Sequence, residues 1–457
     1  MMWQGKTVLV LGLGESGLAV VRWLAREGAT LRVADSRQHP PGLDALNAAA
    51  PDAALHLGDF SSALLDGIDA LAISPGLDPR TGLIAEARAR GIPVTGEIQL
   101  FVDALGALGV RAQTRLIAIT GTNGKTTTTA LTAALYCAAG MDAVAAGNIS
   151  PATLHVLLER LDAGRPLPQC WVLELSSFQL ETVTALGADA AAVLNISDDH
   201  LDRYDSVDAY IAAKTAIFKG ATHRLVNRDD PRVRALAPTA PSFGLDAPTR
   251  AADFGVCDGQ LVRGDTPLLA CAEVPLAGNH NLSNALAALA LCAAAGCPLD
   301  AATAALRTFR GLPHRVEAIA RRDDGVTYYD DSKGTNVGAT VAALEGLGRK
   351  VVLIAGGDGK GQDFSPLCAT VGAHARAVVL IGRDAPLIAR AIDGCGAPLE
   401  FADDLPRAVL RADAIARGGD AVLLSPACAS FDMFRSYVHR AEVFIDAVRA
   451  LPRVMSL

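Results

Sequence analysis

Short apolar runs alternate along this chain with longer segments that are rich in alanine and leucine. The short runs contain many β-branched residues and have the length of buried strands. The longer segments have the composition of helices. Strands that alternate with helices in this way predict parallel sheets with helices packed on their faces. The pattern therefore predicts an α/β protein.

Three of the apolar runs lead directly into glycine-rich segments. They are TVLVLGLGESG at 7–17, RLIAITGTNGKTT at 115–127 and KVVLIAGGDGKG at 350–361. A strand followed by a glycine-rich loop commonly opens a nucleotide-binding sheet. Each run is therefore expected to begin a separate α/β unit.

Two interruptions separate these units. A stretch rich in small residues covers 105–113, and GLPH introduces glycine and proline near 310–314. We therefore expect an N-terminal domain at 1–105, a central domain at 106–312 and a C-terminal domain at 313–457. A chain of 457 residues is long enough for about three domains.

The composition excludes several classes of protein. A net charge of −8 argues against a nucleic-acid binder, which is usually basic. The nine cysteines are scattered and lack the paired spacing of a zinc site. The longest apolar stretch, around 286–297, is too short to cross a membrane, and the charged, glycine-containing N-terminus does not resemble a secretory signal. We therefore expect a soluble, cytoplasmic protein with no nucleic-acid or membrane partner. A monomer is also expected, although none of these observations bears on the oligomeric state.

The first glycine segment has the spacing of a dinucleotide-binding fingerprint. Gly12, Gly14 and Gly17 follow a predicted strand, and Asp35 follows a second one. Three interpretations are open at this point. The loop binds NAD, it binds another nucleotide diphosphate, or its glycines only allow the strand and the helix to pack closely. Arg37 would suit a phosphate or a uracil carbonyl, and nothing later in the chain resembles hydride-transfer chemistry.

The second glycine segment, GTNGKTT at 121–127, lies between an apolar strand and an alanine-rich helix, which is the setting of a phosphate-binding loop. Backbone N–H groups there can surround phosphates, Lys125 can reach the β- and γ-phosphates, and the Thr126 hydroxyl can bind Mg²⁺. The match is imperfect, because Ile119 stands where the usual pattern has glycine. A chance glycine turn with a solvated lysine is the alternative, but the setting and the run of threonines favour ATP binding.

Acidic and imidazole side chains follow two further predicted strands. Glu174 ends one strand, and the segment after the other offers Asp198, Asp199, His200 and Asp202. Such groups at the carboxyl ends of strands face the ligand crevice of an open α/β sheet. Taken singly, Glu174 could pair with a surface arginine, and His200 could cap a helix. Beside a phosphate loop, both fit Mg²⁺ ligands.

Eight motifs occur in order along the chain: GTNGKTT, ELSSFQLE, NISDDHLDRY, HNLSNALAA, GLPHRVE, DDSKGTN, GGDGK and SPACASFDMF. Together they resemble those of the Mur ligases, over nearly the whole chain from Gly5 to about Phe444. The folylpolyglutamate synthases share the phosphate loop and the central histidine region, but they do not combine GLGESG with DSKGTN and SPACASFD. The ordered set is therefore much more specific than any one motif.

The resemblance implies a three-domain α/β fold, with an N-terminal Rossmann-like domain, a central P-loop mononucleotide-binding domain and a C-terminal Rossmann-like domain. It also implies an ATP- and Mg²⁺-dependent ligase that adds D-glutamate to UDP-N-acetylmuramoyl-L-alanine through an acyl phosphate, in the synthesis of peptidoglycan precursors. The N-terminal domain would bind the UDP moiety, the central domain ATP, and the C-terminal domain glutamate.

The resemblance further implies roles for individual residues. ATP would be bound by Gly121, Thr122, Asn123, Gly124, Lys125, Thr126, Thr127, Asn284, Arg315 and Asp331, with Asn281 beside the nucleotide and Asn284 at the adenine. The substrates would contact Ser16, Ser36, Arg37, Gly76, Asn148, Ser176, Thr335, Lys360, Ser430 and Tyr437. Mg²⁺ would be bound by Thr126, Glu174, His200 and Lys214, the last as a carbamate. Catalytic roles would belong to Lys125, His200, Lys214 and Lys333.

Some residues keep a second interpretation. YIAAKTAIF also fits a solvated Lys214 on an amphipathic helix. The chain departs from the family at Glu15, Gly334 and Tyr437, where an apolar residue, alanine and phenylalanine are usual. Two other functions stay open: a nicotinamide-dependent oxidoreductase, which would leave GTNGKTT and DDSKGTN unexplained, and a non-catalytic nucleotide-binding scaffold, which would need to have lost the catalytic residues that are present.

Overall fold

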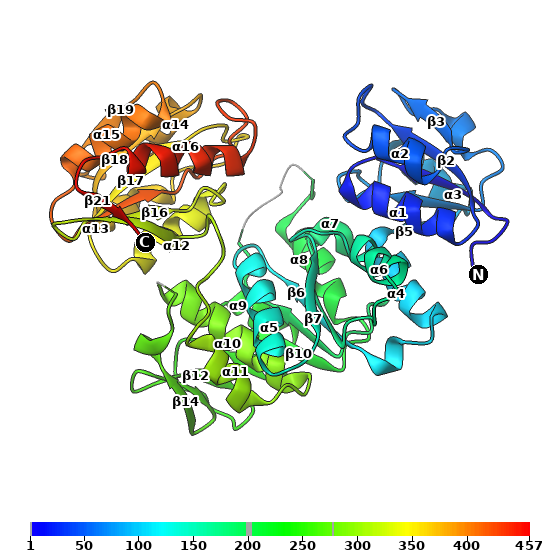
Figure 1. Ribbon diagram of the computed structural model, residues 1–457, viewed down its shortest axis with the longest axis horizontal. Helices are drawn as coiled ribbons and strands as arrows, with labels where there is room; N and C mark the ends of the chain where they lie inside the picture. Colours follow the sequence, from blue (N-terminus) through cyan, green and yellow to red (C-terminus); the bar gives the residue numbers. More distant parts are fainter. Residues whose placement is uncertain (1, 198–202, 277) are drawn as a thin grey trace. The chain divides into compact units, whose positions relative to one another are not determined.

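The computed structural model describes residues 2–197, 203–276 and 278–457. The chain forms two compact units, one made of Met1–Ala270 and Asn284–Arg307 and the other of Cys271–Ser283 and Thr308–Leu457. The first unit contains two sheets and the second contains one (Figure 1). All three sheets are mainly parallel and have helices packed on them, so the predicted α/β class is confirmed.

The first sheet, in blue in Figure 1, has five parallel strands in the order β3-β2-β1-β4-β5. Its strands are β1 (Thr7–Leu11), β2 (Thr30–Asp35), β3 (Ala54–Leu57), β4 (Ala70–Ile73) and β5 (Val94–Gly96). Its helices are α1 (Glu15–Arg26), α2 (Leu43–Ala49) and α3 (Gly82–Ala89). The strand order reverses between β1 and β4, and ligands of open α/β sheets bind at such a point.

The second sheet has nine strands in the order β14-β13-β12-β11-β10-β9-β6-β8-β7, with only β13 and β14 added in antiparallel fashion. Its strands are β6 (Arg115–Thr120), β7 (Ala143–Gly147), β8 (Cys170–Glu174), β9 (Ala190–Val193), β10 (His223–Asn227), β11 (Ser242–Phe243), β12 (Phe254–Cys257), β13 (Gln260–Arg263) and β14 (Thr266–Ala270). The accompanying helices are α4 (Glu97–Ala107), α5 (Lys125–Ala138), α6 (Thr153–Asp162), α7 (Ser177–Leu180), α8 (Val207–Thr215), α9 (Pro231–Leu236), α10 (Asn279–Ala294) and α11 (Leu299–Leu306).

The third sheet has the order β19-β18-β17-β20-β16-β15-β21, with β15 and β21 antiparallel to their neighbours. Its strands are β15 (Glu317–Arg322), β16 (Thr327–Asp330), β17 (Val351–Gly356), β18 (Ala375–Ile381), β19 (Leu399–Phe401), β20 (Ala421–Leu424) and β21 (Val454–Ser456). Its helices are α12 (Val337–Gly346), α13 (Leu367–His374), α14 (Ala385–Ala391), α15 (Leu405–Ile415) and α16 (Tyr437–Arg449). The third glycine segment leads into a loop rather than directly into a helix, because α13 begins only at Leu367.

Three buried strands position the central site. β6 lies between β8 and β9, and all three run in the same direction, with Ile119 opposite Glu174. The three carboxyl ends therefore meet at one edge of the sheet, where a ligand crevice is expected. Apolar residues of the first two sheets belong to one continuous core. In this core Phe101 of α4 packs edge-on against Trp171 of β8, with 4.7 Å between the ring centres.

None of the helices in the described part of the chain is both long enough and apolar enough to cross a lipid bilayer.

Candidate active site

The loop between β6 and α5 has the backbone of a phosphate-binding turn. Gly124 adopts a left-handed conformation with φ of 79°, which glycine adopts at little cost. Asn195, just after β9, holds this loop through both ends of its amide. Its Oδ1 accepts a hydrogen bond from the Asn123 N–H at 2.7 Å, and its Nδ2 donates to the Asn123 carbonyl at 3.0 Å. Sequence analysis missed Asn195, whose only signal is its place at the end of a buried strand.

Lys125 begins α5 and folds back over the loop. Its ammonium donates hydrogen bonds to the carbonyl oxygens of Gly121 at 2.9 Å and Thr122 at 2.8 Å. The side chain is half-buried, and the Thr126 and Thr127 side chains in the same turn are buried. The positive charge of Lys125 is thus placed at the mouth of the loop, where phosphates would lie.

Asn284 of α10 packs directly on the loop. A Cβ atom added to Gly124 would lie 2.4 Å from the Asn284 Oδ1 atom, which is closer than any side chain tolerates. The same Oδ1 atom accepts a hydrogen bond from the Thr128 hydroxyl at 3.2 Å. The residue expected at the adenine therefore lies against the phosphate loop, and both the left-handed backbone and the nearby Asn284 amide disfavour a side chain at position 124.

Glu174 ends β8 with a buried carboxylate that is 1% exposed. One oxygen, Oε1, accepts a hydrogen bond from the Asn148 Nδ2 atom at 2.6 Å. The other, Oε2, is also buried and has no hydrogen-bond partner among the described residues. A buried carboxylate oxygen without a partner is unfavourable unless a cation or water satisfies it. Glu174 therefore fits a metal ligand and does not pair with a surface arginine.

Lys214 of α8 is buried, with 2% of the residue exposed. Its ammonium donates a hydrogen bond to the Gly121 carbonyl at 2.8 Å and lies 4.5 Å from the centre of the Tyr210 ring. The Tyr210 hydroxyl lies 3.1 Å from the Thr122 hydroxyl. The interpretation of Lys214 as a solvated lysine is therefore wrong.

The other residues expected near the metal ions, Asp198, Asp199, His200 and Asp202, lie outside the described residues.

The glycines of the first sheet's motif allow close contacts within the loop after β1 and between that loop and Ser74. A Cβ atom on Gly17 would lie 1.8 Å from the Gly12 carbonyl oxygen, and one on Gly12 would lie 2.6 Å from the Ser74 hydroxyl. Asp35 accepts hydrogen bonds from the Leu13 N–H at 2.7 Å and from two nitrogens of Arg37 at 2.8 and 2.7 Å. The Arg37 hydrogen bond is the main reason that the pKa of Asp35 falls to about 2.

These contacts matter for the nucleotide that the first sheet could bind. Both oxygens of Asp35 already accept hydrogen bonds from the protein, whereas NAD-binding sheets direct that carboxylate at a ribose. Ser36, Arg37 and Gly76 are exposed, and Ser16 is half-buried.

Ser176 has a structural contact of its own. It caps the N-terminus of α7, because its hydroxyl accepts a hydrogen bond from the Gln179 N–H at 3.2 Å, and the Gln179 side chain accepts one from the Ser176 N–H. This reciprocal pair fixes the Ser176 side chain at the carboxyl end of β8, close in sequence to Glu174.

In the second unit, Asp331 is buried and accepts a hydrogen bond from the Ser425 hydroxyl at 2.7 Å. Burial raises the pKa of Asp331 to about 7. A Cβ atom on Gly334 would lie 2.4 Å from the Asp331 Oδ2 atom. An alanine at position 334 would collide with the Asp331 carboxylate where it now lies. This contact gives a steric reason for glycine in place of the usual alanine.

The residues expected around glutamate also lie in the second unit. The Lys333 ammonium is 5.1 Å from the centre of the Tyr437 ring, and the Lys360 ammonium is 6.0 Å from that of Phe431. Ser430 is buried and Thr335 is half-buried. Arg315, which is expected at the nucleotide, is also half-buried.

Arg440 is a further residue that sequence analysis missed. It is fully buried and donates hydrogen bonds to the Ser332 hydroxyl at 3.0 Å, the Ser332 carbonyl at 2.7 Å and the Cys428 carbonyl at 3.1 Å. It therefore joins the segment that carries Lys333 to the segment that carries Ser430. Burial lowers the pKa of Arg440 to about 10.

One other group of potential metal ligands occurs in the described part of the chain. His314, Glu317 and Asp330 offer ligand atoms that lie within 4.8 Å of one another. The Nδ1 atom of His314 is already 2.6 Å from the Asp330 carboxylate, so these two side chains satisfy each other.

The sequence matches three family models in succession. They are the Mur ligase MurD-like N-terminal domain over residues 6–96, the Mur ligase middle domain over 119–292 and the Mur ligase glutamate ligase domain over 314–428. Together they account for most of the chain and follow the order of the three sheets.

Similar proteins agree with these matches. A UDP-N-acetylmuramoylalanine–D-glutamate ligase of Aromatoleum aromaticum is 63% identical over 98% of both chains. One of Nitrosospira multiformis is 54% identical over 98% of this chain and 96% of its own. Among solved structures, the UDP-N-acetylmuramate–alanine ligase MurC of Thermotoga maritima has the same fold, with a TM-score of 0.60, 18% identity, and coverage of 97% of this chain and 99% of its own. The chain belongs to the Mur ligase family of ATP-dependent amide-bond ligases.

Proposed function

We propose that this chain adds D-glutamate to UDP-N-acetylmuramoyl-L-alanine, with hydrolysis of ATP, in the synthesis of peptidoglycan precursors. Two relatives that share 63% and 54% of their residues with it, over almost their whole length, have the name of this ligase. The observation that supports the chemistry best is the grouping of Lys125, Lys214 and Glu174 at one edge of the central sheet.

The reaction requires activation of a carboxylate. The γ-phosphate of ATP passes to the L-alanine carboxylate of the acceptor, which gives an acyl phosphate and ADP. The amine of D-glutamate then attacks the acyl carbon, the new amide bond forms, and inorganic phosphate leaves. Phosphoryl transfer depends mainly on positioning and on neutralisation of charge, which lysines and loop N–H groups can supply.

The central residues have separate parts in this proposal. The N–H groups of 121–127 and the Lys125 ammonium hold the β- and γ-phosphates of ATP. Asn284, with Asn281, lies beside the nucleotide. Thr126 and the free oxygen of Glu174 would hold one Mg²⁺, and His200 with a carbamate of Lys214 would hold a second. When bound, Mg²⁺ neutralises the negative charges of the phosphates and of the attacking carboxylate.

The remaining proposed contacts divide between the substrates. The UDP-linked acceptor would contact Ser16, Ser36, Arg37, Gly76, Asn148 and Ser176. The nucleotide would also contact Arg315 and Asp331. Glutamate would contact Lys333, Thr335, Lys360, Ser430 and Tyr437.

We propose domain limits at 1–105, 106–312 and 313–457. All nine cysteines are free thiols, which favours a reducing compartment such as the cytoplasm.

Phosphate release tests this proposal directly. The purified chain should release phosphate when ATP, Mg²⁺, UDP-N-acetylmuramoyl-L-alanine and D-glutamate are all present. Omission of either substrate, or of Mg²⁺, should abolish turnover. L-Glutamate in place of D-glutamate serves as the matched control and should give little product. Equal turnover with L-glutamate, or full turnover without the UDP-linked acceptor, would contradict the proposed function.

A further inference from the structure

Glu15 is the residue at which the first glycine loop departs from the family, and its carboxylate contacts a loop of the central sheet, the one between β7 and α6. It is the first residue of α1, directly after Gly14. Its Oε1 atom accepts a hydrogen bond from the Ser150 hydroxyl at 2.7 Å and another from the Ala152 N–H at 2.9 Å. Both donors lie in the loop between β7 and α6, so Glu15 connects two glycine-containing loops that are 135 residues apart.

The loop that Glu15 holds also contacts Glu174. The Asn148 N–H donates to the Glu174 carbonyl at 2.8 Å, and the Asn148 side chain donates to the Glu174 carboxylate at 2.6 Å. A Cβ atom on Gly147 would lie 2.5 Å from the Glu174 carbonyl oxygen, so the loop has little room to shift on that side. A continuous series of contacts therefore runs from Glu15 through 148–152 to the proposed metal ligand Glu174.

A second carboxylate fixes the other side of the same loop. Glu97, at the start of α4, accepts hydrogen bonds from the Thr153 hydroxyl at 2.5 Å and the Leu154 N–H at 2.6 Å. The first N–H groups of a helix have no partner within the helix, and they attract carboxylates. The start of α6 is thus held by Glu97 from one side, while Glu15 holds the segment just before it.

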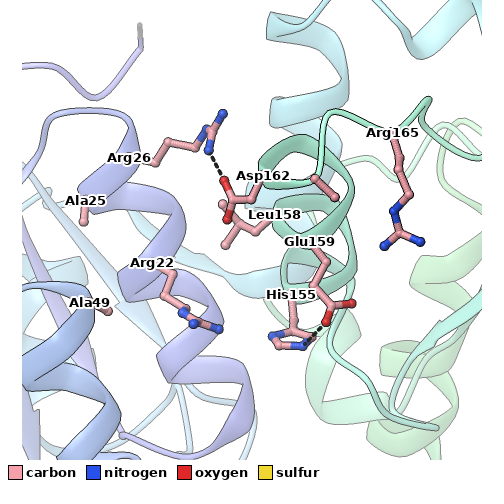
Figure 2. Close-up of a pocket in the computed structure, with 10 residues that line it drawn as sticks. Arg22, Ala25, Arg26, Ala49, His155, Leu158, Glu159, Asp162 and Arg165 are labelled. Atoms are coloured by element: carbon pink, nitrogen blue, oxygen red, sulfur yellow. Dashed lines mark hydrogen bonds and ion pairs between the residues drawn. The ribbon is translucent and has the colours of Figure 1, made fainter.

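Helices α1 and α6 lie side by side and run in the same direction, since Glu15 meets the start of α6 and Arg26 meets its end (Figure 2). Figure 2 shows the second contact, in which Arg26 forms an ion pair with Asp162 beside an open hollow of about 800 Å³. That pair is exposed, and neither residue is among those proposed for the site. It offers a control that disturbs the same pair of helices without touching the loop 148–152.

We infer that Glu15 is a positioning residue for the UDP-linked acceptor. Its carboxylate holds the loop 148–152 in place. Asn148 can then contact the acceptor while it keeps its hydrogen bond to Glu174. This inference rests on the proposed function, because Asn148 is assigned to the acceptor there. It also explains how an acidic residue is tolerated beside a loop expected to bind a diphosphate: the charge is directed at a hydroxyl and an N–H group of the central sheet's loop.

Steady-state kinetics of Glu15→Leu and Glu15→Gln test the inference. Leucine restores an apolar residue and removes both hydrogen bonds, so the KM for UDP-N-acetylmuramoyl-L-alanine should rise about tenfold. The KM for D-glutamate should stay unchanged, because the residues proposed for glutamate lie in the second unit. Glutamine keeps an oxygen that accepts both hydrogen bonds, and it should restore most of the acceptor affinity. Ser150→Ala should raise the KM less, and adding it to Glu15→Leu should have no further effect.

The controls separate this role from a structural one. Arg26→Gln removes the ion pair at the far ends of the helices and should leave every KM unchanged. An unchanged or lower acceptor KM in Glu15→Leu would overturn the inference, as would a Glu15→Gln variant as impaired as the leucine variant. The unaltered chain is assayed first. If it shows no turnover with the acceptor, the proposed function fails, whereas normal turnover together with an unaffected Glu15→Leu variant counts only against the role of Glu15.

Discussion

Lys214 donates a hydrogen bond from its ammonium to the carbonyl oxygen of Gly121 at 2.8 Å, although 93 residues separate the two. The side chain is 2% exposed, so it gives up nearly all of its hydration. The carbonyl and the face of the Tyr210 ring offset part of that cost. A lysine that is almost fully buried is unusual, and its nitrogen lies beside the first residue of the phosphate loop.

The chemical form of Lys214 can be decided by substitution. If the lysine acts as a carbamate that binds Mg²⁺, Lys214→Ala should lose turnover by about a hundredfold or more. Acetate should then restore part of the activity, because it can place a carboxylate where the carbamate stood. Lys214→Arg should remain inactive although it keeps the positive charge. An active arginine variant, together with no effect of acetate, would show that Lys214 is a countercharge.

Lys125 should affect catalysis much more than folding. Its ammonium donates hydrogen bonds to two carbonyl groups of its own loop, and the side chain is half-buried. Lys125→Ala should lower kcat by about a hundredfold or more, because a charge that stabilises the transferred phosphoryl group is lost. The melting temperature should change little. Lys219→Ala removes an exposed lysine from the same unit and should have normal kinetics. Near-normal turnover of Lys125→Ala would reject the assignment.

Several features of the fold and of the candidate site could be predicted from local sequence. The apolar run that begins at Arg115 and the one that ends at Glu174 predict buried strands, and the structure has β6 and β8 there. Because parallel strands bring their carboxyl ends to one edge, the positions of Gly121 and Glu174 near each other followed from the same pattern. The segment GTNGKTT is likewise expected between a strand and a helix, and α5 begins at its lysine, Lys125.

Other features depend on contacts between distant residues, which no local pattern specifies. Asn195 reads as an ordinary strand-end asparagine, yet it holds the phosphate loop from 72 residues away. Arg440 lies on a helix whose sequence gives no sign that its guanidinium is buried against backbone carbonyls.

Gly124 provides a test of the packing between the phosphate loop and Asn284. Gly124→Ala has to adopt a left-handed backbone and also to displace the Asn284 amide, which its Cβ would approach to 2.4 Å. The KM for ATP should rise roughly tenfold, equivalent to about 1.4 kcal/mol. Gly140→Ala is the matched control, because Gly140 has nearly the same φ of 82° but open space around it. Equal effects of the two substitutions on the KM would show that the contact with Asn284 is unimportant.

Glu97 should make the stability of the first unit depend on pH. The residue is 2% exposed, and burial, with a contribution from Glu15, raises its pKa from 4.5 to about 7. The folded state then binds more protons than the unfolded state between these two values, so the free energy of unfolding falls as the pH rises through that window. A shift of this size corresponds to about 3 kcal/mol in total. Glu97→Gln tests this dependence, because it keeps an oxygen for the Thr153 hydroxyl and the Leu154 N–H but cannot ionise.

Urea unfolding should find the free energy of unfolding of Glu97→Gln close to that of the unaltered chain at pH 5 and higher than it at pH 8. The control is Glu159→Gln, which removes an exposed carboxylate from α6 and should show no such divergence. Parallel pH profiles for Glu97→Gln and the unaltered chain would mean that Glu97 does not titrate in this range.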